Sequence, residues 1–127
     1  MTDNDTVRRL IELAERMTRA TDSGSVKWSP NDDTGTSFSY STREASISIR
    51  SKDGDGVHPF ILEVFDSGGV MVESLASGYT EIPDDPWAST GFVWNAALEG
   101  LYGAARRNAL NIDSVIDSLL RSIEPPF

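Results

Sequence analysis

The sequence predicts an α+β fold: an N-terminal helix, an antiparallel meander of about four strands, and two C-terminal helices packed on the sheet as a two-layer sandwich. Apolar residues recur at helical spacing near both ends of the chain and alternate with polar residues in the middle. Only short turns separate the middle segments, whereas parallel strands need long crossovers. The 127 residues have the usual length of one domain, so we expect residues 1–127 to form a single domain.

The first helix is expected from about Asp5 to Thr21. One side of this segment is apolar at helical spacing, charged residues occupy the other side, and Gly24 can end the helix. Residues 22–37 have loop composition, with Val26–Trp28 as a short strand inside them. We expect Trp28 to fold back onto the core, because an exposed Trp leaves a large apolar surface in water.

Period-two patterns predict the strands. Residues 37–41 and 45–50 alternate apolar and polar side chains, which is typical of strands with one buried face. Residues 60–65 are apolar on both faces, as in a central strand, and Gly68-Gly69 indicates a hairpin to a return strand at 70–75. The second face of this sheet would carry four apolar residues: Ile61, Phe65, Met71 and Leu75.

These four residues pose a packing problem. If all helices cover the first face, the four form an exposed apolar patch, and such patches usually mark a contact surface. The alternatives are coverage by Trp28 or Trp87 from the long loops, or a helix that crosses to that side. If the chain forms a homodimer, we expect the dimer to bury this patch.

The C-terminal part predicts a loop and two helices. Residues 76–88 contain Gly and Pro and are expected to form a connecting loop, after which Ser89 or Thr90 can cap a helix running to about Asn108. Asn111 can end that helix in a left-handed turn, and Asp113 can start the next one. The last helix has an apolar stripe formed by Val115, Ile116, Leu119, Leu120 and Ile123.

Charge and cysteine content exclude several classes of function. The net charge is −9, and residues 53–105 hold nine acidic side chains but no Lys or Arg. Phosphate-rich partners would be repelled, so no nucleic acid is expected. The acidic stretch is either a solubilising surface or a face that steers a basic protein partner. Without Cys, a signal peptide or an apolar span, we expect a cytoplasmic protein with no membrane partner.

Motifs for catalysis, metals and cofactors are weak. His58 is the only His and has no nucleophile elbow beside it, so a surface or loop-capping role is the simpler interpretation. The Asp53–Gly56 segment lacks the later ligands of a calcium loop, and no Gly-rich phosphate loop follows a strand. We therefore expect no catalytic residue, no metal and no cofactor.

Aromatic residues surround the acidic Asp84-Asp85 pair. Tyr79, Trp87 and Phe92 cluster with it in the sequence. Either these side chains pin the loop to the core, or they form a recognition edge, because Trp and Tyr dominate binding hot spots.

The segments Leu101–Asp113 and Val115–Leu120, with an N-terminal amphipathic helix and Lys27-Trp28, resemble small uncharacterised bacterial proteins with the same order of helix, meander and two helices. The resemblance implies a bacterial cytosolic domain and carries no activity with it.

Two hypotheses about function follow. The first is a non-enzymatic protein-interaction module, binding a basic protein partner or a second copy of itself. The alternative is a small-ligand-binding domain or enzyme with a pocket between sheet and helices, lined by Tyr40, Trp94 and Tyr102.

Overall fold

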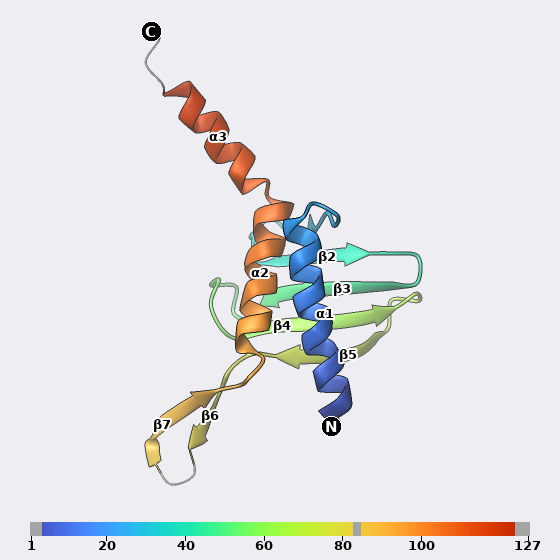
Figure 1. Ribbon diagram of the computed structural model, residues 1–127, viewed down its shortest axis with the longest axis vertical. Coiled ribbons are helices and arrows are strands. Elements are labelled where there is room, and N and C mark those ends of the chain that lie inside the picture. Colours follow the sequence, from blue (N-terminus) through green and yellow to red (C-terminus); the bar gives the residue numbers. More distant parts are fainter. Residues whose placement is uncertain (1–3, 83–84, 124–127) are drawn as a thin grey trace.

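The α+β layout is confirmed. The computed structural model describes residues 4–82 and 85–123, and for residues 81, 82 and 85–90 it describes the backbone alone. An N-terminal helix precedes an antiparallel sheet, a separate hairpin and two C-terminal helices (Figure 1). The elements in chain order are α1 (Asn4–Asp22), β1 (Ser29–Pro30), β2 (Ser37–Ser41), β3 (Ala45–Ser51), β4 (Phe60–Asp66), β5 (Met71–Ala76), β6 (Tyr79–Ile82), β7 (Asp85–Gly91), α2 (Asn95–Ala109) and α3 (Ile112–Ser122).

The main sheet is a meander in the order β1-β2-β3-β4-β5. Every neighbouring pair is antiparallel, and β3 pairs with β4 along its whole length, from Ala45 opposite Asp66 to Ser51 opposite Phe60. Short connections between successive strands allow no other arrangement, as the sequence predicts. β1 and β5 are the two edges of this sheet.

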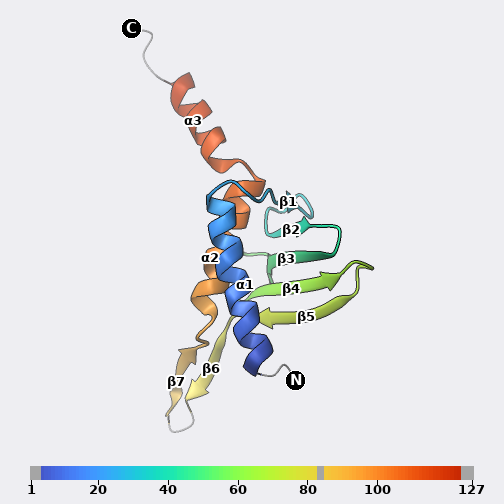
Figure 2. The same cartoon turned by 45° about the vertical axis from the view of Figure 1, so that its right-hand side comes forward.

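The core lies between this sheet and the two long helices. α2 crosses β2, β3 and β4, and α1 lies alongside α2 on the same face of the sheet (Figures 1 and 2). The largest fully buried side chains come from the first loop, the inner strands and α2: Trp28, Phe38, Ile49, Leu62, Leu98 and Leu101.

Trp28 is buried, as predicted, and its surroundings join the two helices. Its indole Nε1 donates to Thr21 Oγ1 at the end of α1 (2.8 Å). Its backbone N–H donates to Asn108 Oδ1 in α2 (2.7 Å), and the amide of Asn108 donates in turn to the Val26 carbonyl (3.0 Å). The predicted position of the short strand, Val26–Trp28, is wrong, because the strand is β1, Ser29–Pro30. The backbone of Val26 and Trp28 bonds to the side chain of Asn108 instead of to a neighbouring strand.

A β-bulge overturns part of the predicted second face. Val64 pairs with Glu73 but Phe65 pairs with Met71, so Val72 is an extra residue in β5. The bulge reverses the alternation of side chains. Met71 therefore shares the second face with Phe65, whereas Leu75 pairs with Leu62 and is buried on the helix side, so the placement of Leu75 in the patch is wrong.

The predicted loop at residues 76–88 is also wrong. Its residues form β6 and most of β7, which pair with each other and extend away from the main sheet (Figure 1). Thr80 pairs with Thr90 and Glu81 with Ser89, so neither Ser89 nor Thr90 caps a helix. α2 begins at Asn95, where Trp94 holds the capping position without a side-chain hydrogen bond.

The two C-terminal helices differ in their surroundings. α2 buries five of its side chains, whereas α3 buries none. Asn111 lies between them with φ 51°, the left-handed turn that the sequence predicts. α3 then extends beyond the end of α2, away from the sheet, in both views (Figures 1 and 2).

Candidate functional site

The apolar stripe of α3 is exposed to solvent. Its side chains are 47% to 75% exposed, and they are Val115, Ile116, Leu119, Leu120 and Ile123. We call this set the α3 stripe. Periodicity identifies the stripe in the sequence, but the structure does not bury it within the chain. Singly exposed apolar residues are ordinary, whereas five on one short helix form a contiguous patch of the kind that marks a contact surface.

The junction before α3 is fixed by specific contacts. Lys27 Nζ donates to the Asn108 carbonyl (2.6 Å) and to Asn111 Oδ1 (3.2 Å), so it caps the end of α2 and holds the turn residue. Leu110 packs partly against the core. α3 therefore starts in a defined direction from an anchored turn.

A shallow groove lies between α1 and the β5 side of the sheet. Its volume is about 390 Å³, and its apolar lining comes from Leu10, Leu13, Val64 and Val72. Charged and polar residues complete its walls: Thr6, Arg9, Glu12 and Arg16 from α1, and Glu73 from β5. We call this the α1–β5 groove. Arg16 forms an ion pair with Glu12 (2.6 Å).

The β5 edge beside this groove is also apolar. Val70, Met71 and Val72 are each more than half exposed. An exposed apolar edge strand presents free backbone groups and tends to pair or to be covered. The groove and this edge lie next to each other, with Val72 belonging to both. The sequence contains no motif for this region, because it depends on the bulge that brings Val72 beside Val64 in the groove.

The predicted second-face patch is smaller than expected. Ile61 and Phe65 are half-buried, and Met71 beside Phe65 is exposed. Serines from β2 and β3 occupy much of the same face, and Arg50 pairs there with Glu63 (3.1 Å). Trp28 lies in the core on the other side, so it does not cover this face.

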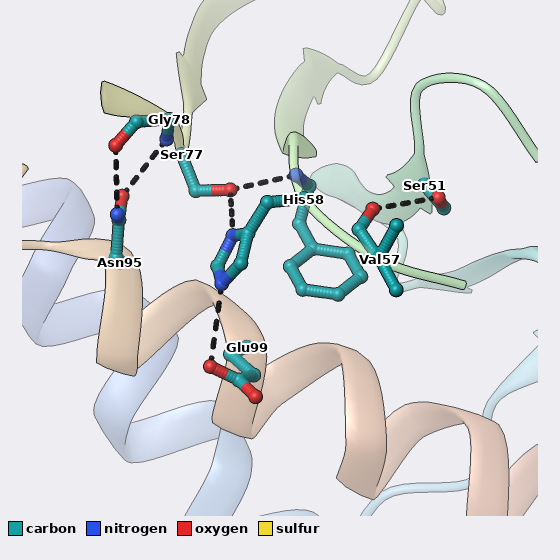
Figure 3. A network of polar contacts seen from close by, with 8 residues as sticks. Ser51, Val57, His58, Ser77, Gly78, Asn95 and Glu99 are labelled. Carbon is teal, nitrogen blue, oxygen red and sulfur yellow. Dashed lines mark hydrogen bonds and ion pairs between the residues drawn. The ribbon is translucent and has the colours of Figure 1, made fainter. Parts of the chain in front are cut away.

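His58 lies in a polar network at the start of β4 (Figure 3). Its Nδ1 is 2.6 Å from Ser77 Oγ, and its Nε2 is 3.3 Å from Glu99 Oε2. A carboxylate only accepts, so in the neutral imidazole Nε2 carries the proton and the Ser77 hydroxyl donates to Nδ1. Ser77 Oγ also accepts from the Phe60 N–H (2.7 Å).

The order Ser77, His58, Glu99 matches the order of groups in a nucleophile–base–acid triad. The surroundings differ from those of a catalytic site. Ser77 is only 3% exposed and does not line any of four hollows that lie on the surface of the described residues. Its oxygen already accepts a backbone N–H, so the network joins β4, the β5–β6 junction and α2. This geometry supports the loop-capping interpretation of His58.

The three residues of the predicted ligand pocket have different ring partners around the core. Tyr40 is near Trp28, with 6.3 Å between ring centroids. Trp94 stacks on Phe92 and donates its Nε1 to the Ala76 carbonyl (2.8 Å). Tyr102 stacks on Phe60, at 4.5 Å between centroids. None of the four hollows is lined by all three residues.

Tyr102 also borders a polar hollow of about 400 Å³, with Asp55 and Arg106 among its lining residues. Its hydroxyl is buried and has no hydrogen-bond partner among the described residues. Burial raises the pKa of Tyr102 above its usual value, because water no longer solvates the phenolate. A phenol that stays protonated and unpartnered packs as a large side chain of the core.

The predicted recognition edge is described only in part. Tyr79 on β6 is 62% exposed, with its ring 6.1 Å from that of His58. Asp84 lies outside the described residues, and Asp85 and Trp87 belong to β7 by their backbone while their side chains lie outside the description. Asn95 anchors the base of this hairpin: its amide bonds to both the N–H (2.9 Å) and the carbonyl (2.7 Å) of Gly78.

Within residues 4–82 and 85–123, no three His, Asp or Glu side chains gather closely enough to bind a metal ion. The helices of this described part are too short or too polar to cross a membrane. Comparison with family models, curated proteins and solved structures finds no match to the chain.

Proposed function

We propose that this chain is a non-enzymatic protein-interaction module and that the α3 stripe is its binding surface. One observation carries the proposal: five large apolar side chains are exposed on a helix of which no residue is buried. Burying one such side chain contributes roughly 1.5–3 kcal/mol. The stripe can therefore supply several kcal/mol to a complex after the costs of association are subtracted.

Three further features support a binding role. Ser77 is buried, so the His58 network offers no accessible nucleophile. The excess of acidic residues between positions 53 and 105 favours a protein partner that is basic around the contact, or a contact that avoids this region. The absence of Cys suits the reducing cytoplasm, where we place the protein.

The test replaces two stripe residues by polar ones. Ile116→Gln/Leu119→Gln keeps helix propensity and removes apolar surface. The control Arg121→Gln changes the side of the same helix that lies opposite the stripe. The wild-type chain and the control are expected to associate, with a second copy or with a protein co-purified from native lysate, and the glutamine variant is expected to lose that association. Equal behaviour of all three chains, in solution mass and in co-purified protein, would contradict the proposal.

A further inference from the structure

We propose that the partner of the α3 stripe is a second copy of this chain, and that α3 of each copy lies in the α1–β5 groove of the other. This inference rests on the proposed function and names its partner. The result is a reciprocal dimer with two equivalent helix-in-groove contacts, related by a two-fold axis.

The positions of the two surfaces exclude contact within one chain. The groove lies along residues Thr6 to Arg16 of α1, near the N-terminal end of that helix. α3 leaves the molecule at the opposite end, beside the C-terminal ends of α1 and α2, and points away from the sheet (Figures 1 and 2). The anchored turn at Asn111 fixes this direction. α3 can therefore reach such a groove only in another molecule.

The groove and α3 match in length and in apolar character. Each turn of an α-helix rises about 5.4 Å, so the groove wall from Thr6 to Arg16 and the eleven residues of α3 are each about 15 Å long. The floor is formed by Leu10, Leu13, Val64 and Val72, which suits a stripe of Val, Ile and Leu.

Charges at the borders of the two surfaces are complementary. On a helical projection of α3, Asp113 and Asp117 border one side of the stripe, and three serines follow the other side: Ser114, Ser118 and Ser122. In the groove, the α1 wall carries Arg9, Glu12 and Arg16, with Arg16 paired to Glu12, so its net charge is +1, while Glu73 lies on the β5 wall. Seating α3 with its aspartates toward α1 places acids against the net positive wall and serines against Glu73. The reverse placement would bring aspartates to Glu73.

Two other arrangements fit less well. Pairing of α3 with α3 would form a coiled coil of eleven residues per helix, well short of the three or four heptads that such pairing usually needs. The hollow between α1 and α2 is lined by Glu15 and Arg19, by two large apolar residues, Ile11 and Val93, and by three small residues, Ala96, Ala97 and Gly100. These two large apolar residues offer the stripe less apolar surface than the two leucines and two valines of the α1–β5 groove.

The experiment exchanges charges between the two surfaces of the full chain. One variant carries Asp113→Arg/Asp117→Arg in α3, and the other carries Arg9→Asp/Arg16→Asp in the groove. Solution mass is measured by light scattering over a range of concentrations. The wild type is expected at twice its 13.9 kDa chain mass, and each variant alone is expected to dissociate at least about 10-fold more readily. An equimolar mixture is expected to return to within about threefold of wild-type affinity, because both contacts of the mixed dimer are again complementary.

A matched control separates position from net charge. Arg8→Asp/Arg19→Asp alters α1 by the same charge outside the α1–β5 groove and is expected to leave the dimer intact. Circular dichroism melting checks that every variant folds. If the new aspartates beside Glu12 unfold α1, the variant Arg9→Gln/Arg16→Gln is used in place of Arg9→Asp/Arg16→Asp.

Each contrary outcome is informative. A groove variant that remains dimeric, or a mixture that does not associate, overturns the groove contact. Dissociation of the Arg8→Asp/Arg19→Asp control would show that the dimer contact involves another face of α1, and would also overturn the groove contact. If the wild type is still a monomer at about 100 μM, the proposal that the partner is a second copy of this chain is wrong. The proposed function is then tested separately, by asking whether a different protein binds the wild type and not the Ile116→Gln/Leu119→Gln variant.

Discussion

Replacing Ser77 by Ala tests whether the His58 network is structural. The hydroxyl of Ser77 serves two groups: it accepts from the buried Phe60 N–H (2.7 Å) and contacts His58 Nδ1 (2.6 Å). Alanine leaves the Phe60 N–H without a partner in the core, which costs about 1–3 kcal/mol. The replacement also removes the hydrogen bond between Ser77 and His58. His58 is half-buried and can turn that nitrogen to water, so the loss of this bond adds about 0.5–1 kcal/mol.

The expected decrease in the free energy of unfolding is therefore about 1.5–4 kcal/mol. With a urea slope of roughly 2 kcal/mol per molar, the denaturation midpoint falls by about 0.8–2 M at unchanged slope. Ser74→Ala on neighbouring β5 is the control, because Ser74 is exposed and its replacement is expected to stay within about 0.5 kcal/mol. Glu99→Gln is expected to change stability equally little, since the Glu99 side chain is 66% exposed.

The opposite result would refute this reasoning. A Ser77→Ala midpoint within about 0.3 M of wild type would show that the hydroxyl does not support the fold. Covalent labelling of Ser77 by a fluorophosphonate probe would show that it is an accessible nucleophile. Either finding would revive the enzyme alternative.

Three further predictions concern the core and α3. Tyr102→Phe removes a buried hydroxyl without a partner, so we expect the free energy of unfolding to rise by up to about 1 kcal/mol at pH 7, measured by urea denaturation. The pKa of Tyr102 is raised in the folded state, so the unfolded chain loses the phenol proton at a lower pH than the folded chain. The stability that comes from this difference is present below the ordinary pKa of 10.0 and is lost as the pH rises through the folded-state pKa. Between pH 9 and about pH 11 the wild type is therefore expected to lose more stability than Tyr102→Phe, and an equal loss in both proteins would contradict this sign. Asn108→Ala removes the bonds to the Trp28 N–H and the Val26 carbonyl, and we expect a loss of about 2–3 kcal/mol together with a changed Trp fluorescence spectrum; a loss below about 0.5 kcal/mol would mean that water replaces the amide. Ile116→Gln/Leu119→Gln is expected to leave the stability of the monomer, measured at low concentration, within about 0.5 kcal/mol of wild type, because α3 buries no side chain; a cooperative loss of several kcal/mol would show that the stripe packs within the chain.

The sheet could be predicted well from the sequence because its signals are local. Alternating Phe38 and Tyr40, the two-sided segment 60–65 and the Gly68-Gly69 turn together allow one antiparallel order. Asn111 likewise indicates its left-handed turn, since Asn tolerates this conformation better than most residues. In each case the information lies within a few residues of the feature.

The bulge and the hairpin could not be predicted in this way. The pairing of Phe65 with Met71 depends on how β4 and β5 meet, and no turn or glycine in the sequence marks the extra residue Val72. β6 and β7 contain Pro and acidic residues that indicate a loop, yet their backbones pair with each other. Pairing between these two backbones depends on contacts across the hairpin, which Pro and acidic residues in the sequence do not mark.

The α3 stripe shows what hydrophobic periodicity can and cannot establish. A stripe of five apolar residues indicates that the helix is buried in some state, but it does not indicate that the burying surface belongs to the same chain. A net charge of −9 sets a condition on that surface, because like-charged copies repel unless opposite charges meet at the contact. α1 holds four of the eleven basic residues, and two of them, Arg9 and Arg16, border the α1–β5 groove, whose lining combines Leu from α1 with Val from the sheet. Charge thus restricts where the stripe can dock, and the stripe supplies the apolar surface that makes such docking stable.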